Sequence, residues 1–107
     1  MGRDLASLLQ RIHSLVDARG VDPAKPLLTE MEHTLTDGYA RALELEAERL
    51  RLERRIAELA HTLDGPEEAG ELRDLAAQLR TADDDLASLR NVLAVLQQRV
   101  DAGRAAA

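Results

Sequence analysis

An unbroken heptad pattern of apolar residues in the C-terminal third of the chain constrains the fold more than any other feature. The first heptad positions are Leu72, Leu79, Leu86, Leu93 and Val100. The fourth positions are Leu75, Ala82, Leu89 and Leu96. Such a pattern is typical of a helix that buries one stripe in a coiled coil. We expect this helix over about residues 67–102, with residues 103–107 as a frayed tail after Gly103.

A second heptad pattern precedes it and supplies the partner helix. Its first positions are Leu28, Leu35, Ala42, Arg49, Ile56 and Leu63, and its fourth positions are Met31, Gly38, Leu45, Leu52 and Leu59. Thr29 and Glu32 have the spacing of a capping box, so we expect a helix over about residues 28–63. Residues 64–67 form a short turn, which forces the two helices to run antiparallel.

The N-terminal segment predicts a shorter amphipathic helix over about residues 3–18. Its apolar stripe consists of Leu5, Leu8, Leu9, Ile12, Leu15 and Val16. Pro23 and Pro26 interrupt the chain between about residues 20 and 27, because proline cannot continue a helix. The expected fold is all-α: one helical domain over residues 1–107, with a short helix and a long antiparallel coiled-coil hairpin. Two such chains could associate into a larger bundle.

Composition excludes several classes of protein. The chain has no cysteine, so disulfides and thiolate chemistry are absent. The formal net charge of −6 argues against nucleic-acid and anionic-membrane partners. The first helix has polar residues among its apolar ones, unlike a signal peptide or a membrane span, so we expect a cytoplasmic location. Lys25 is the only lysine, and abundant Ala, Leu and Gly indicate a GC-rich bacterial genome.

Three adjacent aspartates, 83–85, raise the question of a metal site. In the register that pairs Leu52 with Leu79 and Gly38 with Leu93, Arg49 lies in the seam opposite Ala82. Asp83 and Asp85 then flank the seam, and we interpret them as counter-charges for Arg49, since an unpaired buried cation costs several kcal/mol. Successive helical side chains point about 100° apart, so three adjacent carboxylates cannot converge on one ion.

No pattern predicts catalysis. Glu30 with His33 and Glu58 with His61 have the Glu-x-x-His spacing of di-iron bundles, but both pairs fall on outward heptad positions. The chain has no P-loop, dinucleotide fingerprint or nucleophile elbow. We therefore expect no catalytic residue, no metal ligand and no cofactor, and predict that the protein is not an enzyme. A metal shared between two chains is the alternative for the Glu-x-x-His pairs.

The functional prediction rests on large apolar residues that the hairpin seam does not bury. Tyr39, Leu43 and Leu50 lie outside the seam of the hairpin. Either the first helix packs over Tyr39 and Leu43, or two chains associate and bury these residues between them. We expect a protein–protein interaction module, such as a small bacterial regulatory adaptor or scaffold. Its partner would be a second copy in a homodimer or another protein.

Arginines of the hairpin give the alternative function, a nucleic-acid or nucleotide-binding arm using Arg51, Arg54 and Arg55. The layout of a short helix, "ARGVD", a break and a long hairpin resembles the tRNA-binding arm of seryl-tRNA synthetases, which implies an RNA partner. The C-terminal helix resembles anti-sigma coiled coils that bind cyclic di-GMP through E-x3-S-x2-R-x3-Q-x3-D. Only Arg90 matches that motif, with Asp83 as a conservative replacement, so nucleotide binding is not carried over.

Overall fold

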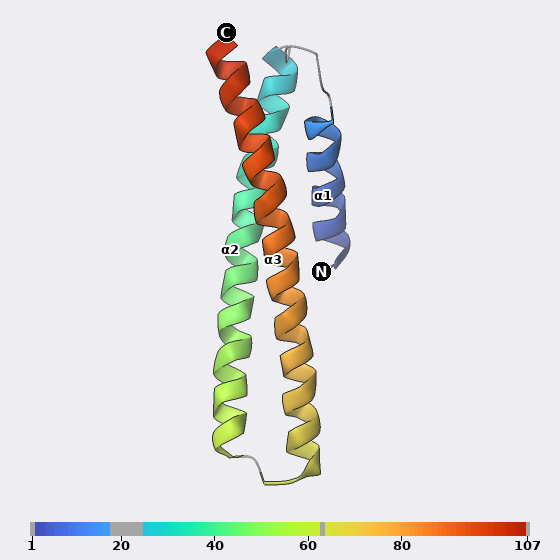
Figure 1. Cartoon of the computed structure of the whole chain (residues 1–107), viewed down its shortest axis with the longest axis vertical. Helices are drawn as coiled ribbons and strands as arrows, with labels where there is room; N and C mark the ends of the chain where they lie inside the picture. The colour runs from blue at the N-terminus through green and yellow to red at the C-terminus, as the bar shows by residue number, and fades with distance from the viewer. Residues whose placement is uncertain (1, 18–24, 63, 107) are drawn as a thin grey trace. The chain divides into compact units, whose positions relative to one another are not determined.

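The fold is all-α, as the sequence predicts. A computed structural model describes residues 2–17, 25–62 and 64–106. Its helices are α1 (Gly2–Val16), α2 (Lys25–His61) and α3 (Pro66–Ala106), and the described residues contain no strand (Figure 1). Helices α2 and α3 form the expected antiparallel hairpin. Within the described parts of the chain, no helix has the length and apolar character needed to cross a membrane.

Two helix ends differ from their predicted positions. Helix α2 begins at Lys25 rather than near residue 28, because Pro26 is compatible with the first helical turn, where no N–H is needed. Helix α3 continues to Ala106, so residues 103–106 are helical and not a frayed tail. In this added turn Gly103 is buried, and Arg104 Nη2 lies 3.2 Å from Glu32 Oε2 of α2. The predicted break falls largely on residues outside the described ranges.

The chain forms two compact units. Unit 1 comprises Met1–Ala42 and Ser88–Ala107, so it contains α1, the start of α2 and the end of α3. Unit 2 comprises Leu43–Ala87, which includes the rest of α2, the turn and the start of α3. The expectation of a single domain stays a prediction.

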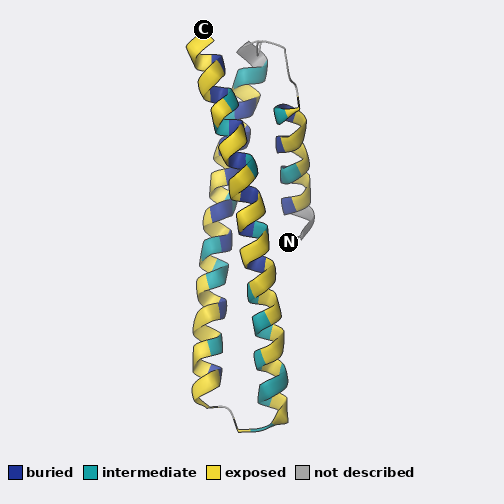
Figure 2. Ribbon diagram, viewed as in Figure 1, coloured by how far each residue is buried: buried dark blue, intermediate teal, exposed yellow. Residues whose placement is uncertain are grey.

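Unit 1 has a core made by three helices. Helix α1 turns one side toward the others (Figure 2), and that side carries Leu5, Leu8, Ile12 and Leu15, all buried. Helices α2 and α3 contribute Met31, Leu35, Ala42, Leu89, Leu93, Leu96 and Val100. At the edge of this core Arg11 Nη2 of α1 lies 2.6 Å from Asp37 Oδ2 of α2. Burial of apolar side chains from all three helices is what holds α1 in place.

The expected packing of the first helix over Tyr39 and Leu43 is not observed. Tyr39 is 46% exposed and Leu43 is 65% exposed. Helix α1 instead meets the side of α2 that bears Asp37 and the fully buried Thr34. Tyr39 lies on the opposite flank of the seam, where its hydroxyl donates a hydrogen bond of 3.2 Å to Gln97 Oε1. No pattern in the sequence distinguishes these two flanks of the hairpin.

Contacts within each unit agree with the predicted register. In unit 1 the Leu93 side chain lies against Gly38, where an added Cβ would be 3.3 Å from Leu93 Cγ. In unit 2 Arg55 Nη2 lies 2.9 Å from Glu71 Oε1, a pair that flanks the seam in the same register. Unit 2 has only two helices, so its seam is less covered: Leu52 and Leu59 are buried, whereas Ile56, Leu72, Leu75 and Leu79 are half-buried.

Candidate interaction surface

The outward side of α2 in unit 2 carries an apolar stripe. Leu43 is 65% exposed and Leu50 is 50% exposed, although both are large apolar side chains. They are one heptad apart and therefore lie on the same side of the helix. Ala47, also exposed, lies between them at the i+4 position from Leu43 and the i−3 position from Leu50. We call Leu43, Ala47 and Leu50 the outer stripe.

Charged residues border the outer stripe on both sides. Glu44 and Arg51 follow Leu43 and Leu50 in the sequence and share one border. Glu46 and Glu53 form the other border. An apolar stripe of 4-3 spacing between two charged rows is the arrangement by which helices select partners in coiled coils. The outer stripe is thus a second potential seam, separate from the one that α2 uses with α3.

Tyr39 has a different role from the two leucines. It belongs to unit 1, and its hydroxyl is engaged with Gln97 of α3. Gln97 Nε2 in turn donates a hydrogen bond of 3.0 Å to Asp101 Oδ1. The Tyr39 side chain therefore links α2 to α3 within unit 1. Of the three predicted interaction residues, only Leu43 and Leu50 belong to the outer stripe.

The structure brings Arg49 to Asp83 but not to Asp85. Arg49 Nη1 lies 3.5 Å from Asp83 Oδ1, and Arg49 Nε lies 3.8 Å from Glu53 Oε1. Both carboxylates border the same edge of the seam, and the arginine stem extends toward that edge. Asp85 lies along the opposite edge, and in the described part of the chain it makes no ion pair with Arg49. The role of Asp85 as a counter-charge stays a prediction.

Arg49→Leu is expected to leave the free energy of unfolding unchanged, or to raise it by up to about 1 kcal/mol. The ion pairs of Arg49 are long and half exposed, and its Nε is buried without a hydrogen-bond partner. Leucine would fill the seam without burying a nitrogen that lacks a hydrogen bond. Urea unfolding followed by circular dichroism measures the change. A marked loss of stability would instead show that Arg49 makes an essential contact.

The three arginines of the alternative basic patch differ in their surroundings. Arg55 lies 2.9 Å from Glu71 and 3.7 Å from Glu58. The hydrogen bond to Glu71, together with the charge of that carboxylate, raises the pKa of Arg55 above the ordinary value for an arginine. Its charge is therefore paired within unit 2. Arg51 and Arg54 are exposed and remain the stronger candidates for an external anion.

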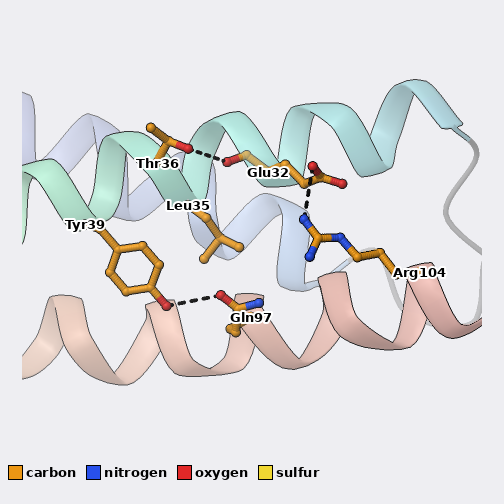
Figure 3. Close-up of a pocket in the computed structure, with 6 residues that line it drawn as sticks. All are labelled: Glu32, Leu35, Thr36, Tyr39, Gln97 and Arg104. Carbon is orange, nitrogen blue, oxygen red and sulfur yellow. Dashed lines mark hydrogen bonds and ion pairs between the residues drawn. The ribbon is translucent and has the colours of Figure 1, made fainter.

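Unit 1 has a shallow pocket between α2 and α3 (Figure 3), lined by Glu32, Leu35, Thr36, Tyr39, Gln97 and Arg104. Its polar side chains point toward one another in pairs. Arg104 lies 3.2 Å from Glu32, and Tyr39 donates to Gln97. Thr36 Oγ1 donates a hydrogen bond of 3.1 Å to the Glu32 carbonyl oxygen. A ligand would have to displace these internal partners, so we assign none to the pocket.

Metal-binding groups do not gather in the described part of the chain. Three or more His, Cys, Asp or Glu side chains come together nowhere in it. Glu30, His33, Glu58 and His61 are all exposed. The Glu-x-x-His pairs therefore lie on solvent-facing surface, as their heptad positions indicate.

Sequence reasoning missed two residues that shape the surfaces. Ala47 lies between Leu43 and Leu50 on the same side of α2. Its spacing of four and three residues from them could have identified it as part of the same stripe. Thr34 is fully buried at the α1 contact although its Oγ1 has no hydrogen-bond partner. A threonine at a flanking heptad position gave no sign of that burial.

The described residues thus form an all-α helical hairpin with a third helix packed in one of its two units. Comparison with known proteins finds no matching family model, no matching curated protein and no matching solved structure. The resemblances to the seryl-tRNA synthetase arm and to anti-sigma coiled coils stay predictions.

Proposed function

We propose that this chain is a non-enzymatic protein–protein interaction module, an adaptor or scaffold, which binds through the outer stripe. The observation that carries the proposal is the exposure of Leu43 and Leu50 on one side of α2. Moving a leucine side chain fully out of water contributes roughly 1.5–3 kcal/mol, so covering two half-exposed leucines gives a useful part of a binding free energy. An amphipathic helix from a partner is the natural ligand for such a stripe.

The double variant Leu43→Gln/Leu50→Gln tests this function. Immobilised wild-type chain should capture specific proteins from a lysate of the source organism, and the variant should lose most of them. A matched control, Ala77→Gln/Ala87→Gln, introduces the same side chain at two exposed positions of α3 in unit 2. If the leucine variant and the control both retain every protein that the wild type captures, the outer stripe is not the binding surface.

Exposure of Arg51 and Arg54 supports the second candidate, a nucleic-acid-binding arm. The net charge of −6 opposes it. Such binding should weaken steeply with salt and should be reduced by Arg51→Gln/Arg54→Gln. Titration of labelled tRNA and of single-stranded RNA at two salt concentrations measures both properties. Absence of binding at low salt would remove this candidate.

A further inference from the structure

We propose that the occupant of the outer stripe is a second copy of this chain, with the two α2 helices packed antiparallel about a two-fold axis. This inference rests on the proposed function, because it assumes that the stripe binds protein. It adds the identity of the partner and the alignment of the two helices. Two features of α2 support it: the order of large and small side chains along the outer stripe, and the charges beside them.

The outer stripe alternates in size in a way that complements itself when reversed. Leucine, alanine and leucine follow one another at 4-3 spacing in residues 43, 47 and 50. An antiparallel alignment can place Leu43 against the partner's Ala47, and the two-fold axis then places Ala47 against the partner's Leu43. Leu50 packs on the turn of the partner helix that precedes its Leu43. Each large side chain thereby meets a small one, which lets the helices approach closely.

The same alignment joins opposite charges. It brings Glu44 beside the partner's Arg51, and symmetry makes this contact twice. Glu44 and Arg51 flank the outer stripe at the same heptad position at which two pairs flank the α2–α3 seam. Those pairs are in contact: Arg104 lies 3.2 Å from Glu32, and Tyr39 donates a hydrogen bond to Gln97. Opposite charges at such flanking positions determine partner choice and orientation in coiled coils.

Other alignments of two copies bring like charges together. Sliding the antiparallel pair by one heptad places Arg51 against the partner's Arg51 and Glu44 against the partner's Glu58. A parallel pair places Arg54 against the partner's Arg54 in the seam and Glu53 beside the partner's Glu58. Like charges at these positions are destabilising. The antiparallel alignment of Leu43 on Ala47 has one like-charge contact of its own, Glu53 beside the partner's Glu32, at the offset that Arg55 and Glu71 have in the hairpin. We favour it because it joins Glu44 to the partner's Arg51 twice and keeps Arg51 and Arg54 away from their own copies.

A charge-swap cycle tests the alignment. Glu44→Arg and Arg51→Glu each turn both attractive contacts into repulsive ones, so each should weaken the dimer about tenfold. The double variant restores opposite charges and should return the dissociation constant to within about threefold of wild type. In a parallel dimer the double variant would not recover, because Arg51 would face the partner's Glu46. Sedimentation equilibrium measures the dissociation constants, and circular dichroism checks that all variants remain helical.

Cysteine cross-linking gives a second readout, since the chain has no cysteine of its own. Leu43→Cys and Ala47→Cys should form a disulfide when the two variants are mixed and oxidised. Each variant alone should form little, because residues four apart on the helix lie about 6 Å from each other along the axis. Disulfides within each variant alone would show a parallel pair and overturn the inference.

The outcomes separate this inference from the proposed function. A wild-type chain that stays monomeric at every concentration overturns the inference, as does a double charge swap that fails to recover. If a monomeric wild type still captures another protein in a manner that depends on Leu43 and Leu50, the proposed function stands without it. If the leucine variant neither changes the mass nor loses any captured protein, both are overturned.

Discussion

Gly38→Leu is expected to lower the free energy of unfolding by about 3 kcal/mol, the upper end of overpacking effects in well-packed cores. A Cβ at this position would run into the Leu93 side chain, with Leu93 Cγ at 3.3 Å and Cδ1 at 3.4 Å. Leu93 is only 1% exposed, so it has little free space into which it can move. Larger side chains at Gly38 therefore push α2 and α3 apart within unit 1. Urea unfolding of wild type and variant measures the loss.

The effect should depend on Leu93, which provides a control. In a Leu93→Ala background the obstructing side chain is gone, so Gly38→Ala should raise the free energy of unfolding by up to about 1 kcal/mol through higher helix propensity. In the wild-type background the same change has to overcome the clash as well, and should give a clearly smaller or negative effect. Equal effects in both backgrounds would contradict the contact between Gly38 and Leu93.

Ile12→Ala is expected to lower the free energy of unfolding by about 3 kcal/mol, within the usual range for removing a buried isoleucine side chain. Ile12 is 0% exposed at the centre of the α1 stripe, so truncation leaves a cavity between α1 and the rest of unit 1. The loss should appear in thermal and urea unfolding.

Gln10→Ala on the exposed side of α1 is the matched control and should change the free energy of unfolding by less than about 0.5 kcal/mol. An Ile12→Ala chain as stable as the control would show that α1 does not contribute to the core of unit 1.

The helices and their pairing could be predicted because the signals are local and repeated. Heptad spacing in residues 72–100 fixes one face of α3, and Gly38 opposite Leu93 gives a large side chain its space. The helix ends were less predictable. The last turn of α3 contacts Glu32 of α2 through Arg104, and no pattern near residue 104 reveals that contact.

The surfaces were predictable in part, for a related reason. Heptad position alone shows that Leu43 and Leu50 point away from the seam, and both are exposed. It does not show which flank of the hairpin receives α1, because Thr34 on one flank is no more apolar than Tyr39 on the other. Heptad position also does not show toward which edge of the seam the Arg49 side chain extends. In the structure it extends toward the edge that carries both Glu53 and Asp83.

Absolute mass by light scattering across a dilution series tests the central claim most directly. Wild-type chain should approach twice 11.7 kDa at high concentration and fall toward 11.7 kDa on dilution. Leu43→Gln/Leu50→Gln should remain near 11.7 kDa throughout, while Ala77→Gln/Ala87→Gln should behave as wild type. A wild-type mass of 11.7 kDa at every concentration, or a dimer that the leucine changes leave intact, would contradict the assignment of the outer stripe as the self-association surface.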